Sequence, residues 1–294
     1  MDNISGIAVI DKDKGYTSHD VVNVIRRLYK IRKVGHTGTL DPDATGVLPV
    51  CIGKATKVCD LLTVSDKCYR ARIKLGIRTD TYDISGSVTE EHEVNVGEDE
   101  LRSAAAKFTG EIMQLPPMYS AIKIGGKKLC DLARKGIEVE RSPRAVTVYR
   151  ADVSDFDGVS FTLDVSCSKG TYIRTLADDI GKSLGCGAVL TELRRTKSYM
   201  FDLSDSYRLD DLEKMSDEEL KSILMPVDSV FGNYRAITVN DTVRQRLTNG
   251  ARAYIRADAG TYRVYDDRGE FLCIGEVFKN DVGKTNIKLV KAFF

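Results

Sequence analysis

Apolar and basic side chains alternate with a period of two along Lys67–Gly76, and this pattern restricts the fold more than any other feature of the chain. The apolar positions run from Tyr69 to Leu75 at every second residue. Because successive side chains of a strand point to opposite faces, the pattern predicts a strand with one buried face. Phe161–Cys167 alternates in the same way. The buried faces need partners, and periodic apolar stripes predict helices at residues 19–29, 98–109 and 171–184.

The composition is that of a soluble globular protein. The chain has 294 residues, enough for one large domain or two smaller ones, with 42% hydrophobic and 30% charged residues. No apolar run reaches the roughly 18 residues of a membrane helix, and the first residues lack the features of a secretory signal. The seven cysteines are scattered without a Cys-x-x-Cys pair, so neither a zinc site nor a disulfide framework is expected. These features favour the reducing cytoplasm.

Charge is sorted along the chain, although the net charge is only +1. Residues 119–150 contain eight lysines and arginines but three acidic residues, whereas residues 90–111 are strongly acidic. Residues 125–146 are also glycine-punctuated and weakly periodic, which predicts a projecting element rather than core. The sorting is compatible with a basic face for nucleic acid and also with ordinary solvated surface.

The segment GHTGTLDPDATG, residues 35–46, concentrates turn-forming residues around Asp41 and Asp43. A phosphate-binding loop is excluded, because the glycine spacing in GVLPVCIGKAT is too long and alanine replaces the magnesium-binding hydroxyl. A calcium loop is excluded as well, because no bidentate glutamate follows at the right distance. Two interpretations remain: an Asx-turn without chemistry, and a loop that presents one carboxylate as a nucleophile. Pro42 stiffens the backbone and Gly38 permits close approach of a ligand, as the second interpretation requires.

Two further residues could complete a site with Asp41. Arg174 is expected in the first turn of the helix at 171–184, where a cation opposes the helix dipole at a cost of roughly 0.3–1 kcal/mol. A carboxylate would offset this cost; Asp41 and Asp178 are both candidates, and so is plain exposure to solvent. Tyr69 lies on the apolar face of its strand, either as a core tyrosine or as a ring that stacks on a planar base.

The last part of the chain changes character. An acidic helical stretch covers residues 209–224, and a domain boundary is expected within MPVDSVFGNYRAITVN, residues 225–240. Beyond it, a helix ending at Asn249-Gly250 and several short apolar segments predict a small β-rich module. We therefore expect one domain over residues 1–232 and a second over residues 233–294.

Several long segments, in order, resemble the TruB family of tRNA pseudouridine synthases of the bacterial type. The resemblance covers nearly all of the expected first domain, and the tail resembles a PUA-type RNA-binding module more weakly. One departure is the segment DKDKG, where the family more often has Lys-Pro; this would loosen the turn without touching the acid. The segments that carry the resemblance are DKDKGYTSHDVV, KVGHTGTLDPDATGVLPVCIGKATK, DKCYRARIKLGIRTDTYDISG, LPPMYSAIKIGGKKLCDLARKGIEVERSPRAVTVY and CSKGTYIRTLADDIGKSLGCGAVLTELRRT.

The resemblance implies roles for individual residues. Asp41 matches the catalytic aspartate, Tyr69 the ring that packs on the target base, and Arg174 the arginine that pairs with the aspartate. The residues expected to contact the flipped nucleotide or its RNA neighbours, or to support the pocket, are His36, Tyr172, Leu193 and Lys14. The residues expected to meet RNA phosphates, in an insertion at about 119–150, are Lys127, Lys128, Arg134, Lys135 and Arg141.

The resemblance also implies a fold and a reaction. The fold would be α+β, with a long mixed, largely antiparallel sheet, flanking helices and a central cleft, followed by the PUA-like module. The reaction would convert the T-loop uridine of tRNA, conventionally numbered 55, to pseudouridine without a metal or organic cofactor. The target base must leave its stack, which costs a few kcal/mol that pocket contacts repay. We expect a cytoplasmic monomer that acts on the T stem-loop of tRNA without an obligatory protein partner or a membrane.

Two alternatives stay open at this point. The first is an RNA-guided pseudouridine synthase of the dyskerin type, although such chains usually carry longer terminal extensions. The second is a non-catalytic RNA-binding or tRNA-folding protein, which would keep the basic insertion but could lose the acid. The presence of Asp41, Tyr69 and Arg174 together favours an enzyme.

Overall fold

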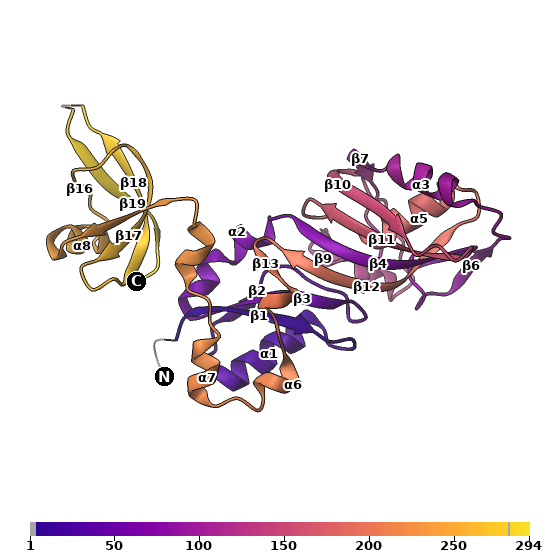
Figure 1. The fold of residues 1–294 in the computed structure, drawn as a ribbon, viewed down its shortest axis with the longest axis horizontal. Coiled ribbons are helices and arrows are strands. Elements are labelled where there is room, and N and C mark those ends of the chain that lie inside the picture. Colours follow the sequence, from indigo (N-terminus) through magenta and orange to yellow (C-terminus); the bar gives the residue numbers. More distant parts are fainter. Residues whose placement is uncertain (1–3, 282) are drawn as a thin grey trace.

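The computed structural model describes residues 4–281 and 283–294, and these residues form a long sheet and a smaller one at opposite ends of an elongated molecule (Figure 1). The long sheet has ten strands among the described residues. It is mixed but mostly antiparallel, since only β1–β14 and β3–β12 pair in parallel. In spatial order its strands are β14 (Tyr207–Arg208), β1 (Gly6–Lys12), β3 (Thr45–Ile52), β12 (Ala188–Ser198), β4 (Lys67–Leu75), β11 (Ser160–Cys167), β10 (Arg144–Ser154) and β7 (Gly110–Gln114), with β13 (Phe201–Asp202) beside β12 and β2 (Val34–His36) beside β3.

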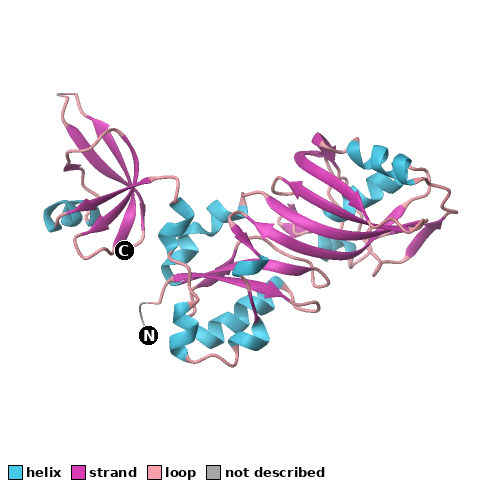
Figure 2. Cartoon of the chain, in the orientation of Figure 1, coloured by secondary structure: helices cyan, strands magenta, loops and turns pink. Residues whose placement is uncertain are grey.

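The alternating segments form adjacent strands in the middle of this sheet. β4 lies between β12 and β11, and its apolar positions Ala71, Ile73 and Leu75 are buried. The opposite face is polar, where Arg70 pairs with Asp164 of β11 across the strands at 2.9 Å. The predicted half-buried strands are therefore confirmed, and so is the α+β class, because helices cover the sheet (Figure 2).

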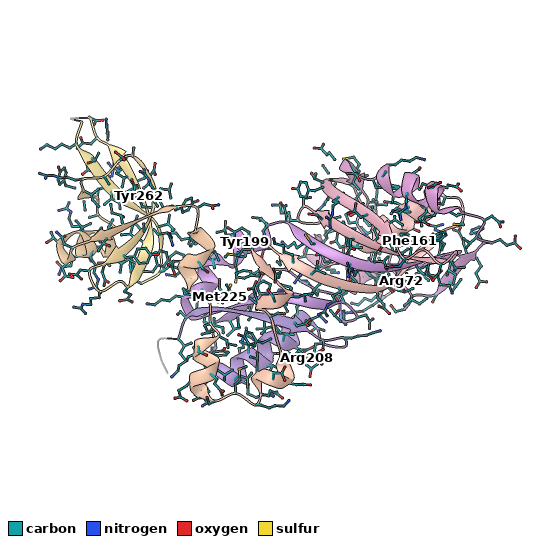
Figure 3. The ribbon with its side chains drawn as sticks, viewed as in Figure 1. Arg72, Phe161, Tyr199, Arg208, Met225 and Tyr262 are labelled. Atoms are coloured by element: carbon teal, nitrogen blue, oxygen red, sulfur yellow. The ribbon has the colours of Figure 1, made fainter. Side chains whose placement is uncertain are left out.

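Helices cover the long sheet in three groups. α3 and α5 close one hydrophobic core, in which Phe161 is fully buried (Figure 3). α1, α6 and α7 close a second core, and η1, α2 and η3 contribute to a third. The helices around the long sheet are α1 (Ser18–Tyr29), η1 (Gly53–Val58), α2 (Cys59–Thr63), α3 (Glu98–Ala106), α5 (Ile173–Ser183), η2 (Leu203–Asp205), α6 (Leu209–Leu212), α7 (Asp217–Ser222) and η3 (Val227–Phe231).

α1 begins one residue earlier than predicted, because Thr17 caps it: the Thr17 hydroxyl accepts from the Asp20 N–H in a capping box. The acidic stretch at 209–224 is not one helix but two, since Ser216 forms a new capping box with Glu219 and starts α7.

Between β7 and β10 the chain leaves the sheet as the insertion (residues 115–143). It contains a two-stranded hairpin of β8 (Lys123–Ile124) and β9 (Lys127–Lys128), followed by α4 (Leu129–Ala133). Residues 144–150, which we expected within the insertion, belong to β10. A second small hairpin, β5 (Ile77–Thr79) with β6 (Val88–Glu91), follows β4.

The C-terminal residues form a separate sheet of five strands with its own core, in which Tyr262 is buried (Figure 3). It packs on the rest of the chain through aromatic rings: the Phe231 ring centroid is 6.3 Å from that of Phe271 and 5.8 Å from that of Phe293. The elements of this module are, in chain order, β15 (Arg235–Val239), α8 (Asp241–Thr248), β16 (Ala253–Tyr254), β17 (Gly260–Asp266), β18 (Phe271–Lys279) and β19 (Thr285–Ala292).

Candidate active site

The Asp41 loop (residues 37–44) joins β2 to β3, and buried side chains hold its backbone. Lys12 of β1, which is fully buried, donates from Nζ to the Pro42 carbonyl at 3.0 Å. The Ser18 hydroxyl accepts from the Leu40 N–H at 2.8 Å and donates to the Leu40 carbonyl at 3.2 Å. Burial lowers the pKa of Lys12 to about 8, and the surrounding carboxylates oppose this shift. The loop is therefore fixed on both sides of Asp41.

Arg174, the second residue of α5, brings a buried guanidinium to Asp41. Its Nε lies 3.1 Å from Asp41 Oδ2, and its Nη1 lies 3.6 Å from Asp83 Oδ2. The carbonyls of Thr81 and Tyr119 accept from its Nη1 and Nη2 at 3.1 and 2.8 Å. The Arg174 side chain is 7% exposed but that of Asp41 is 49% exposed. The pair is thus rigid on the arginine side and open to a ligand on the carboxylate side.

Asp178, the other candidate partner of Arg174, is engaged elsewhere. Its carboxylate is buried and accepts from Arg78 Nε at 2.9 Å and lies 2.6 Å from Lys182 Nζ. These two cations satisfy the Asp178 carboxylate. The two alternatives to an Asp41 partnership, a local pair and plain exposure of Arg174, are therefore excluded.

Tyr69 of β4 stands beside Arg195 of β12, its cross-strand neighbour. Burial raises the pKa of Tyr69, and a hydrogen bond to Arg195 works in the opposite direction. Arg195 is itself buried and donates from Nε to the Val47 carbonyl at 2.6 Å and from Nη2 to the Gly38 carbonyl at 3.2 Å. One side chain therefore connects the tyrosine to the start of the Asp41 loop.

A cavity of about 290 Å³ brings the predicted site residues together. Asp41, Tyr69, Tyr172, Arg174 and Leu193 all line it, from four separate parts of the chain. Its volume is at the small end of the range for ligand pockets. Carboxylate, guanidinium and aromatic ring thus meet around a space suited to one small planar group.

His36 and Lys14 lie at neighbouring hollows instead. His36 lines a larger hollow of about 820 Å³ that it shares with Asp41 and Arg134. Burial lowers the pKa of His36, so the neutral ring is favoured. Lys14 is exposed, with Nζ 3.9 Å from Asp43 Oδ1, and lines a third hollow behind Asp41. The support expected from Lys14 comes from the buried Lys12 of the same motif.

The basic residues of the insertion differ in their surroundings. Lys127 and Lys135 are exposed, and Arg134 is exposed with a loose pair to Asp131 at 3.7 Å. Arg141 is mostly buried and donates to the Pro116 carbonyl at 3.0 Å, so it ties the two ends of the insertion together. The side chain of Lys128 lies outside the described part of the structure.

Sequence reasoning missed a group of four lysines near the C-terminal module: Lys33, Lys54, Lys57 and Lys291. Their segments lie side by side, since the Gly53 N–H donates to the Lys33 carbonyl at 2.8 Å and Lys57 Nζ donates to the Ala292 carbonyl at 2.9 Å. Burial and the charges of the other three lower the pKa of Lys57. In the described part of the chain none of them forms an ion pair. They gather where β3 ends, at the opposite end of that strand from the Asp41 loop. Composition alone could not reveal this group, because its members come from three distant segments.

Three further residues of the site were missed for a similar reason. Lys12, Asp83 and Arg195 all contact the Asp41 loop or Arg174. Asp83 could have been noticed in TDTYD, where small polar residues crowd around carboxylates as they do around Asp41. Among residues 4–281 and 283–294, no cluster of three or more His, Cys, Asp or Glu side chains could hold a metal ion. Within the same ranges, no helix is long and apolar enough to cross a membrane.

Comparisons with known proteins agree with this site and fold. The family model for the N-terminal domain of TruB pseudouridylate synthases matches residues 26–173, and the model for the C-terminal domain of tRNA pseudouridylate synthase B matches residues 174–232. By class, the chain is therefore a pseudouridine synthase.

Relatives that match nearly the full length of the chain narrow the assignment from this class to a family. The tRNA pseudouridine synthase B of Alkaliphilus oremlandii is 42% identical over 99% of both chains, and that of Clostridium acetobutylicum is 43% identical over 98% of this chain and 100% of its own. The corresponding protein of Pseudomonas fluorescens is 44% identical over 94% of this chain and 92% of its own. The chain belongs to the TruB family.

Solved structures show the same architecture at lower identity. A Cbf5–Nop10–Gar1 complex matches 98% of this chain and 85% of its own, with a TM-score of 0.71 and 27% identity. An H/ACA ribonucleoprotein bound to a substrate RNA containing 2′-deoxyuridine matches the same shares with a TM-score of 0.70 and 26% identity. The expected pseudouridine synthase fold is confirmed, including the β-rich C-terminal module.

Proposed function

We propose that this protein converts the T-loop uridine of tRNA, at the position conventionally numbered 55, to pseudouridine. The observation that carries the proposal is the Asp41–Arg174 pair at 3.1 Å in a cavity that Tyr69 also lines. The named relatives are tRNA pseudouridine synthases, and their identity of 42–44% over most of the chain supports tRNA as the substrate.

The geometry suits the chemistry of this isomerisation. Uracil must be detached from the ribose at nitrogen, turned, and reattached at carbon without leaving the pocket. Asp41, oriented by Arg174, acts as the nucleophile, and Tyr69 stacks on the flipped base, which contributes about 1–3 kcal/mol. Tyr172 and Leu193 form the remaining walls. The half-exposed Asp41 loses contact with water when the base enters, and this strengthens its pairing with Arg174.

Basic surfaces on both sides of the pocket would hold the RNA backbone. The insertion offers Lys127, Arg134 and Lys135, and the junction with the C-terminal module offers the four-lysine group. Phosphate contacts of this kind give salt-dependent affinity. We propose that residues 1–232 perform catalysis and that residues 233–294 bind RNA as a PUA-like module. The protein would act as a monomer in the cytoplasm.

The decisive experiment gives the purified protein alone an unmodified tRNA transcript and maps pseudouridine at single-nucleotide resolution. We expect one modified position, in the T-loop. Asp41→Asn should lower the single-turnover rate by at least about ten-thousand-fold while leaving tRNA affinity within about threefold. The matched variant Asp43→Asn removes the neighbouring, exposed carboxylate and should retain most of the activity. Equal losses in both variants, or modification at another uridine, would refute this assignment.

The likeness to Cbf5 complexes raises the RNA-guided alternative. At 26–27% identity these structures are much more distant than the tRNA pseudouridine synthases. The experiment above separates the two, because a guide-dependent enzyme leaves the transcript unmodified when no guide RNA is present. A protein that only binds or folds tRNA leaves it unmodified with or without a guide.

A further inference from the structure

Gln114, the last residue of β7, makes an unusual pair of contacts with the start of α5. Its side chain is buried, and both polar atoms of its amide bond to the backbone of one residue. Oε1 accepts from the Tyr172 N–H at 2.7 Å, and Nε2 donates to the Tyr172 carbonyl at 3.1 Å. A side-chain amide thus binds the backbone in the way that a neighbouring strand would.

The residue held in this way is the N-cap of α5. The Tyr172 side chain makes no capping bond, so the first turn lacks the usual local restraint on its position. The Tyr172 carbonyl also accepts from the Leu176 N–H at 3.0 Å, the first hydrogen bond of the helix. Gln114 therefore fixes the point at which α5 begins relative to the sheet.

The same segment of chain contacts α5 a second time. Five residues after Gln114, the Tyr119 carbonyl accepts from Arg174 Nη2 at 2.8 Å. The chain that leaves β7 thus binds the backbone of α5 at residue 172 and its guanidinium at residue 174. Two contacts on one helical turn determine both where the turn lies and where Arg174 points.

We propose that Gln114 is a positioning residue that sets the start of α5 and through it the approach of Arg174 to Asp41. It does not touch the cavity and acts only through Tyr172 and Arg174. The proposal rests on the proposed function, because its effect is read in pseudouridine formation. Glutamine is required for its two complementary atoms: glutamate would set an oxygen against the Tyr172 carbonyl, and methionine keeps the shape without either bond.

The test compares Gln114→Met and Gln114→Glu with the wild type under single-turnover conditions, with enzyme in excess and saturating. Both variants should lower the rate constant by about ten- to a hundredfold with tRNA affinity changed by less than about threefold. In an Arg174→Lys background the same Gln114→Met change should lower the rate constant by less than about threefold, because the arginine through which Gln114 acts has already been replaced. Tyr29→Phe is the matched control, since it removes a buried hydrogen bond of 2.6 Å to the Leu220 carbonyl far from the cavity.

The outcomes separate positioning from plain stability. Tyr29→Phe should lower the melting temperature and leave the rate constant unchanged. Unchanged rate constants in both Gln114 variants, or a full loss that repeats in the Arg174→Lys background, would overturn the proposal. If Gln114→Met loses its native circular dichroism, Gln114→Glu decides, because it keeps one of the two bonds. A wild-type protein that makes no pseudouridine would overturn the proposed function instead.

Discussion

The Asp41 loop and the insertion both line the hollow of about 820 Å³, and they are held in opposite ways. Buried side chains from β1, α1 and β12 bond to the backbone of the Asp41 loop. The insertion is closed at its base by the bond from Arg141 to the Pro116 carbonyl and contacts α5 through the Tyr119 carbonyl on Arg174, while its basic tip is exposed. Catalysis requires reacting atoms that are positioned to within a fraction of an ångström. Binding of an RNA phosphate backbone requires only positive side chains that are long enough to contact it.

The largest effect is expected when the Asp41 loop loses one of the side chains that hold it, because this removes the contrast with the insertion. Lys12→Met removes the donor to the Pro42 carbonyl, and leaving a buried acceptor unpaired costs about 1–3 kcal/mol. We expect the single-turnover rate to fall by about ten- to a hundredfold, with tRNA affinity nearly unchanged. Lys214→Met, at an exposed lysine paired loosely with Asp211, is the control and should be silent. A loss of affinity without loss of rate would show that the Asp41 loop binds RNA rather than aligning the acid.

The insertion should respond in the opposite sense. In Arg134→Ala/Lys135→Ala, tRNA affinity should weaken by about tenfold and depend less steeply on salt, because phosphate contacts are lost. The rate constant at saturation should stay within about twofold. The control Arg27→Ala/Lys30→Ala removes the same charge from the C-terminal end of α1 and its cap, where both residues pair with acidic side chains. Equal weakening in both double variants would mean that total charge, not the insertion, governs binding.

The smallest expected effect is on the pH dependence of the single-turnover rate, and it tests the role of Lys12. Below its pKa of about 8 the protonated amine has three N–H groups, and it donates to the carbonyls of Asp13, Tyr16 and Pro42. Above that pKa only two N–H groups remain, so one carbonyl loses its donor. The single-turnover rate should therefore fall by about two- to fivefold between pH 7 and pH 9. The Lys12→Met protein should lack this decline; an identical profile in both proteins would assign it to another group.

Site residues could be predicted from the sequence where a chemically reactive side chain lies within a recognisable local pattern. Asp41 and Tyr69 could be found because a crowded turn and an alternating strand are local signals. Arg174 was recognisable because a cation in the first turn of a helix needs an explanation. The structure supplies that explanation. Arg78 and Lys182 pair with Asp178, so the carboxylate that pairs with Arg174 is Asp41.

Other residues could not be predicted because their partners lie far away in the chain. Arg195 reaches the Asp41 loop only because β12 pairs in parallel with β3, an arrangement that no local pattern indicates. Gln114 reaches Tyr172 only after β7 has joined the sheet edge. Lys14 and Lys12 occupy the same short motif, and burial alone distinguishes the supporting residue from the exposed one.

The aromatic contact between Phe231, Phe271 and Phe293 has a consequence for how the molecule comes apart. The rings belong to a hydrophobic core that also contains Ile7 and Val9 of the first strand. Cutting the chain after residue 232 would strip cover from that strand, so we expect the two sheets to melt as one cooperative unit rather than in turn. Under the proposed function, a junction packed in this way would set the distance between the cavity and an RNA segment bound by the outer sheet.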